Sequence, residues 1–211
     1  MLILDVRVAI DPKHDHALNE WYHTHVPRLV SLPGYTSGRR YVSLTDGPRY
    51  AALYEITDPS YLPSLLGADP AARHPLTLSE WAEWDERFVP HMTHGSTDLY
   101  EAAGAPSPLL VGDGPVVEFR FEGALRDGEP LPGIERSATW LRAANRAEVA
   151  WLHTRPANLL LVQPTDVDAA IALSRDEDVR AALRDRGAAD IECVAYAQIA
   201  RHWPYAKEHM P

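Results

Sequence analysis

Residues 20–35, with the sequence EWYHTHVPRLVSLPGY, hold the side chains of this chain best suited to chemistry on a small molecule. The stretch carries Trp21, Tyr22, His23 and His25 within one helix length and then closes on a Pro-Gly turn. Residues three and four apart share a helix face, so His25 should point inward beside the aromatic residues while His23 faces solvent. An imidazole titrates near neutral pH, which makes His25 a candidate general acid or base. The structural alternative is a core histidine hydrogen-bonded to a backbone carbonyl.

Other aromatic and polar residues are candidates to complete such a site. Trp81, Trp84 and Phe88 recur at helical spacing, either as ordinary core or as a planar apolar slot for a ring. A strand tyrosine could donate a hydrogen bond to a substrate carbonyl, and an arginine could stabilise an enolate. The structural alternative is core packing for each tyrosine and a solvent-exposed position for each loop histidine. The catalytic candidates are His25, Tyr54, His91 and Arg40, and the substrate-binding candidates are Trp21, Tyr22, Tyr41, Trp81, Trp84, Phe88 and His74.

The spacing of the remaining polar residues favours neither a metal nor a nucleotide. The pair His91-x-x-His94 follows a proline and has no third ligand nearby in the sequence. No P-loop, G-x-G-x-x-G or G-x-S-x-G motif occurs. We therefore expect no metal site and no cofactor.

The amino-acid composition limits the kinds of partner that this chain can bind. Acidic residues outnumber Lys and Arg by 30 to 20, a net charge of -10, which disfavours nucleic acid and anionic membranes as partners. No run of 18 or more apolar residues occurs, and the N-terminus carries an acid and an arginine inside its apolar run, unlike a signal peptide. The single Cys193 cannot form an internal disulfide. These features predict a cytoplasmic globular protein, and the aromatic candidates above favour a hydrophobic small molecule as its substrate.

The elements that must position these residues follow from local patterns. Residues 2–10 alternate as a strand, with Asp5 and Arg7 opposite the apolar face. A helix is predicted from residue 15 to about 32, followed by strands at 38–45 and 49–57 that a turn at 46–48 connects. A short helical stretch is predicted at 60–67. A further helix, which begins with a Thr77–Glu80 capping box and runs to about 88, precedes a strand at 96–103. The predicted order is therefore βαββαβ.

The pattern restarts after a linker at residues 104–115 that is rich in Gly and Pro. ILDVRV at 3–8 matches VVEFRF at 116–121, and a predicted helix at 176–186 matches the aromatic helix of the first half. An internal duplication is the economical interpretation. The predicted units are residues 1–103 with the site, the linker, a degenerate repeat at 116–203, and a tail at 204–211. In the second repeat, the segment of residues 122–133 is too short and too rich in Gly and Pro to form a counterpart of the first helix. The helix face that carries EWYHTH therefore occurs once in the chain.

Several of these residues together resemble a known family. Trp21, Tyr22, His25, Pro27, Pro33, Gly34, Arg40 and Tyr41 resemble the signature of the EthD-like branch of the dimeric α+β barrel superfamily. The resemblance covers residues 1–103 and implies a ferredoxin-like unit, two of which pack as a barrel. The implied fold class is α+β, with two ferredoxin-like repeats forming an intramolecular pseudo-dimeric α/β barrel, either monomeric or a weak homodimer. The paired acids and arginines of residues 5, 7, 118 and 120 would then face its interior and pair across it.

The resemblance leaves the activity open, because one fold hosts many functions. Relatives include cofactor-free monooxygenases, polyketide cyclases, muconolactone isomerases and haem-binding proteins. We favour a small enzyme that acts on a hydrophobic aromatic or polyketide-like metabolite by cofactor-free acid/base chemistry, that is, cyclisation, dehydration or isomerisation. The alternatives are a cofactor-independent monooxygenase, and a non-catalytic carrier or haem-binding protein with His25 or His91 as axial ligand.

Overall fold

The computed structural model describes residues 1–102, 109–123, 131, 134, 138–144, 146–149, 151–199 and 203–204. In chain order its elements are β1 (Leu2–Ile10), α1 (Asp15–Val30), β2 (Tyr35–Ser43), β3 (Tyr50–Ile56), α2 (Leu62–Leu66), α3 (Pro75–Arg87), β4 (Met92–Glu101), β5 (Val116–Glu122), β6 (Ala138–Ala143), β7 (Asn158–Val162), α4 (Val167–Ser174), α5 (Glu177–Asp185), β8 (Ala189–Gln198) and β9 (Trp203–Pro204). Short 3-10 turns lie between them.

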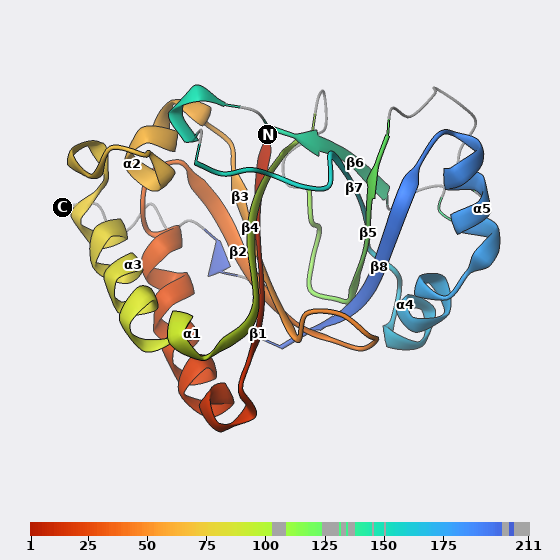
Figure 1. Cartoon of the computed structure of the whole chain (residues 1–211), viewed down its shortest axis with the longest axis horizontal. Helices are drawn as coiled ribbons and strands as arrows, with labels where there is room; N and C mark the ends of the chain where they lie inside the picture. Colours follow the sequence, from red (N-terminus) through yellow and green to blue (C-terminus); the bar gives the residue numbers. More distant parts are fainter. Residues whose placement is uncertain are drawn as a thin grey trace.

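Strands β1 to β8 form a closed antiparallel barrel. Their order is β3-β1-β4-β6-β7-β5-β8-β2, and a further pairing of β2 with β3 joins the two ends, while β9 flanks β2. Helices α1 to α3 cover one side of the barrel and α4 and α5 cover the other (Figure 1). The α+β barrel fold predicted from the sequence is therefore confirmed.

Each half of the barrel has the same strand order. The first half reads β4-β1-β3-β2 and the second reads β8-β5-β7-β6. The halves meet where β4 pairs with β6, at Tyr100 opposite Ala143, and where β2 pairs with β8, at Val42 opposite Ala197. Both halves therefore supply strands to one barrel, whose interior they enclose together.

Most element boundaries lie within a few residues of those predicted, but the capping box does not exist. Helix α3 begins at Pro75, and its N-cap is His74, whose ring accepts a hydrogen bond from the Leu76 N–H. The prediction of a Thr77–Glu80 cap is therefore wrong, because Glu80 lies in the second turn and is directed toward α1.

Helix α4 was not expected. Residues 104–108 of the predicted linker, most of 122–133 and the tail after 204 lie outside the described residues.

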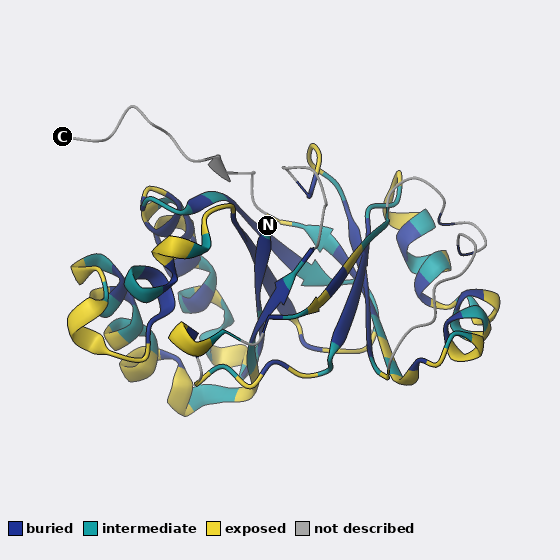
Figure 2. Cartoon of the chain, turned by 90° about the horizontal axis from the view of Figure 1, so that it is seen from above, coloured by how far each residue is buried: buried dark blue, intermediate teal, exposed yellow. Residues whose placement is uncertain are grey.

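Strands β1, β3, β5 and β7 bury both of their faces, whereas parts of β4, β6 and β8 are exposed (Figure 2). Along β1, Leu2, Leu4 and Val8 belong to an apolar cluster under α1, α2 and α3, whereas Ile3 belongs to a cluster inside the barrel. A third apolar cluster lies between the second-half strands and helices α4 and α5. The alternation along β1 thus separates a helix-facing layer, which holds the candidate site, from the barrel interior.

Charged residues of the two halves pair inside the barrel. Arg120 of β5 binds Asp5 of β1 and lies 2.6 Å from the Asp98 carboxylate, with its side chain fully buried. Arg7 of β1 lies 2.9 Å from Glu192 of β8. The predicted pairing across the interior is confirmed for Arg120 and Asp5. For the other two residues it is wrong, because Arg7 pairs with Glu192, which is 43% exposed, and the Glu118 oxygens have no hydrogen-bond partner among the described residues. These pairs connect the two halves and lie apart from the helix-facing layer.

Candidate functional site

A cavity of about 310 Å³ lies between α1, α3 and the outer face of the first-half strands. This volume is at the lower end of the range for small-molecule sites. Its walls are mostly aromatic, and the aromatic residues that line it are Trp21, Tyr22, Tyr35, Tyr54, Trp81, Trp84 and Trp151. The flat apolar surfaces and the size suit a compact ring system rather than a polar metabolite.

His25 lies in this cavity and is held from two directions. Its ring stacks on Trp21 with 3.8 Å between centroids, and its Nδ1 lies 2.6 Å from Glu80 Oε2. The other Glu80 oxygen lies 2.6 Å from Arg28 Nη1, and the Glu80 side chain is only 1% exposed. Arg28, Glu80 and His25 thus form a chain of ionic and hydrogen-bonding contacts that ends at the cavity.

This arrangement sets the protonation of the imidazole. A carboxylate accepts hydrogen bonds but cannot donate them, so the His25 Nδ1 carries the proton that it donates to Glu80. The lone pair then lies on Nε2. Burial lowers the pKa of His25 below 6.5, although the hydrogen bond and charge of Glu80 act in the opposite direction. His25 is therefore neutral at pH 7, with one nitrogen able to accept a proton.

Tyr54 of β3 supplies a hydrogen-bond donor in the same cavity. Its ring lies edge-on to the His25 ring, with 6.5 Å between centroids. The buried hydroxyl has no hydrogen-bond partner within the described part of the chain. Burial raises the pKa of Tyr54 well above its usual value, so the hydroxyl stays protonated. It can donate to a ligand oxygen that enters the cavity.

Two of the sequence-predicted residues lie directly behind the cavity wall. Phe88 is buried and packs on Trp21 and Trp84 without lining the cavity. The Arg40 guanidinium stacks over the Tyr22 ring at 4.0 Å and binds Asn19 Oδ1 at 2.6 Å. Tyr22 therefore separates Arg40 from the cavity, and a direct contact of Arg40 with a ligand is not supported by this geometry.

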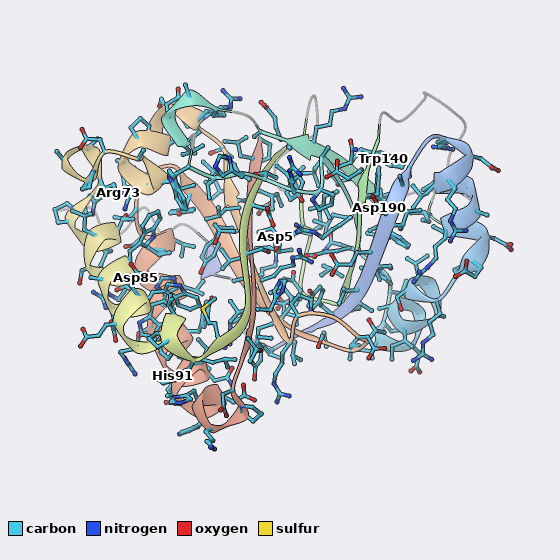
Figure 3. All side chains as sticks on the ribbon, viewed as in Figure 1. Asp5, Arg73, Asp85, His91, Trp140 and Asp190 are labelled. Atoms are coloured by element: carbon cyan, nitrogen blue, oxygen red, sulfur yellow. The ribbon has the colours of Figure 1, made fainter. Side chains whose placement is uncertain are left out.

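Three further candidates lie away from the cavity. Tyr41 faces the barrel interior, because its strand alternates and its neighbours point to the helix layer. His91 stacks on His14 at 3.6 Å, near the lower end of the helical layer and below Asp85, which lines the cavity (Figure 3). His74 is exposed and serves as the N-cap of α3. These placements assign the three residues packing, stacking and capping contacts.

Sequence reasoning missed three important residues, although it placed Trp21, Tyr22, His25, Tyr54, Trp81 and Trp84, all of which line the cavity. Glu80 is an acid on the same helix face as Trp84, a signal that the capping interpretation obscured. Arg28 follows His25 by three residues, so both lie on adjoining parts of α1. Trp151 comes from the second half of the chain, and no local pattern could have assigned it to this site.

Within the described ranges, no helix is long and apolar enough to cross a membrane. Across the same residues, no group of three or more His, Cys, Asp or Glu side chains has an arrangement able to hold a metal ion.

No protein-family model and no curated protein sequence matches the chain. Solved structures with a similar fold include the following three. An anthrone oxidase-like protein aligns over 98% of this chain and 94% of its own, with a TM-score of 0.57 and 14% identity. A candidate chlorite dismutase aligns over 94% and 95%, with a TM-score of 0.57 and 12% identity. A candidate monooxygenase from Fusobacterium nucleatum aligns over 94% and 93%, with a TM-score of 0.54 and 8% identity. The chain therefore shares its α+β barrel fold with these three proteins.

Proposed function

We propose that this protein is a small enzyme that removes a proton from a hydrophobic aromatic or polyketide-like metabolite by cofactor-free acid/base chemistry. One observation carries the proposal. A cavity walled by aromatic rings holds both a neutral imidazole, oriented by Glu80, and the unpartnered hydroxyl of Tyr54. A base and an oxyanion donor that converge on one apolar space are the groups that enolisation requires.

The proposed reaction uses each group once. The Nε2 of His25 accepts a proton from an acidic carbon of the substrate, and Glu80 stabilises the imidazolium that forms. The hydroxyl of Tyr54 donates a hydrogen bond to the enolate oxygen. The aromatic walls hold the ring and exclude water, which strengthens both interactions. Return of the proton from Nε2 to another substrate atom completes an isomerisation or cyclisation, and protonation of a leaving hydroxyl completes a dehydration.

A second candidate function shares the first step. An enolate or carbanion formed beside His25 can react directly with molecular oxygen, as in a cofactor-independent monooxygenase. The observation that favours this candidate is the likeness of the fold to an anthrone oxidase-like protein over nearly the whole of both chains. The two candidates differ only in what consumes the anion, a proton or oxygen.

The residues present do not fit a haem. One face of the His25 ring is covered by Trp21 at 3.8 Å, its Nδ1 is held by Glu80, and the cavity of about 310 Å³ is small for a macrocycle. His91 is stacked on His14 outside the cavity. We therefore place the haem-binding alternative behind the two enzymatic ones, and a titration with hemin that gave a Soret band would reverse that order.

The remaining finer assignments are also proposals. We infer that the halves arose by internal duplication, because their strand orders match and both halves have counterparts in similar structures. The EthD-like branch is favoured by the residues around Trp21 and His25. From the sequence we also propose a cytoplasmic location and either a monomeric pseudo-dimer or a weak homodimer.

Anthrone is a suitable first probe, because its methylene protons are acidic. Under nitrogen in deuterated buffer, the protein should accelerate exchange of those protons, measured by NMR. In air, oxygen uptake at the same rate would assign the monooxygenase, whereas exchange without uptake would assign the acid/base enzyme. Binding of anthrone with no exchange above buffer would make the protein a carrier and contradict the proposal.

The pH dependence of kcat/KM should report the pKa of His25 in the free enzyme. The base must be neutral, and its pKa lies below 6.5, so activity should be constant above that value and fall as the pH drops through the lowered pKa. Glu80→Gln removes a charge that raises the pKa of His25 and should move the acid limb to lower pH. Arg28→Gln removes a charge that lowers it and should move the limb to higher pH. Shifts in the same direction for both variants would contradict the assignment.

A further inference from the structure

A second hollow adjoins the aromatic cavity. This groove, also about 310 Å³, lies over the outer face of β1 and β4. It shares four lining residues with the cavity, namely Val6, Thr97, Trp84 and Trp151. A ligand that fills the cavity can therefore extend past the two tryptophans into the groove and stay in contact with the protein along its length.

The groove suits an apolar occupant. Val6, Val8, Met92 and Leu152 line it. Arg7 is also a lining residue, but its guanidinium is already engaged, with Nη1 2.9 Å from Glu192 and Nε 3.3 Å from Ser96 Oγ. Because this charge is satisfied within the protein, a polar ligand group would have to displace one of these contacts to bind Arg7, whereas an alkyl chain would only displace water.

One wall of the groove comes from the second half of the chain and is firmly attached. The segment of residues 151–155 runs between β6 and β7 and reaches the helices of the first half (Figure 1). The Trp151 indole N–H donates to the Leu66 carbonyl at 2.7 Å, and Thr154 accepts from the backbone of the first-half strand β4 at 2.9 Å. The buried Arg120 binds the carbonyl of Arg155 at 2.8 Å. The tryptophan between the two hollows is thus fixed by both halves.

The floor of the groove can adapt to a chain. Gly95 of β4 has no side chain there, and a Cβ placed on it would meet only the Met92 side chain, with the terminal methyl at 2.0 Å and the sulfur at 3.8 Å. A methionine side chain is flexible and fills irregular apolar space. Bulk at position 95 would compete with Met92 and with any ligand for the same volume.

We propose that the substrate is an elongated molecule, with a compact ring system in the cavity beside His25 and an alkyl or acyl chain in the groove beyond Trp151. This inference rests on the proposed function, since it concerns the substrate class of the same site. It also gives the second half of the barrel a direct part in binding, through Trp151 and Leu152.

The test is a binding series of 2-naphthol and its 6-propyl and 6-pentyl derivatives, followed by tryptophan fluorescence. In the wild-type protein, each methylene that enters the groove should tighten binding about fourfold. Gly95→Leu should remove this gain while leaving the affinity for 2-naphthol unchanged. Gly114→Leu, a glycine-to-leucine change at a position with open space around it, should keep the full gain.

Two results would overturn the inference. Equal affinities across the series in the wild-type protein would show that the groove takes no chain, and an equal loss for all three ligands in Gly95→Leu would show general distortion of β4 instead. These outcomes are separate from the proposed function, because they concern the slope of affinity with chain length. Failure of the proposed function would appear as absent proton exchange, whatever that slope is.

Discussion

Replacing His25 by alanine is expected to lower kcat by about 10²–10⁴-fold, the range that a general acid or base contributes. The variant keeps Trp21, Tyr22 and the other aromatic walls, so the affinity for an aromatic ligand should change little. Such a split between kcat and binding marks a group that acts in the transition state rather than in ligand binding. Steady-state kinetics and a direct binding measurement on the same substrate give the two numbers.

His23→Ala is the matched control. His23 lies two residues away on α1, is exposed, and should tolerate alanine with unchanged kinetics. If His25→Ala also kept full activity and lost only thermal stability, His25 would be a packing residue that balances the buried Glu80. The proton acceptor would then have to be sought elsewhere in the cavity.

Replacing Arg120 by methionine should lower the free energy of unfolding by about 3–5 kcal/mol, the cost of removing one partner from a buried ionic pair. Arg120 lies in the barrel interior with no exposed side-chain surface and binds Asp5, Asp98 and the Arg155 carbonyl. Methionine fills similar volume but leaves both carboxylates buried without their cation. Urea denaturation, followed by circular dichroism, measures the difference.

An exposed ion pair on the same half provides the comparison. Arg184 of α5 lies 3.5 Å from Glu177, and both side chains are more than half exposed. Arg184→Met should change the free energy of unfolding by no more than about 0.5 kcal/mol, because water and salt screen such pairs. Similar effects of the two substitutions would mean that the interior charges are hydrated and do not connect the halves.

The sequence determined the local features of this protein. The two-residue alternation over residues 2–10 predicted both the strand and its two faces, and the charged residues proved to lie on the interior side. The helical spacing through Trp21, Tyr22 and His25 predicted their shared buried face, and the solvent position of His23. Such features are readable because the period of an isolated strand or helix fixes which neighbours share a face.

Only the tertiary structure decided which distant groups meet at the site. Glu80 reaches His25 because α3 packs against α1, a contact across fifty-five residues of sequence. Trp151 enters the same cavity because barrel closure brings the β6–β7 connection over the first half, whereas His74 and His91 lie on turns that leave it. Sequence periodicity describes one element at a time, while the angle and register at which elements dock depend on the packing of all of them together. The proton acceptor was therefore visible in the sequence, and the carboxylate that orients it was not.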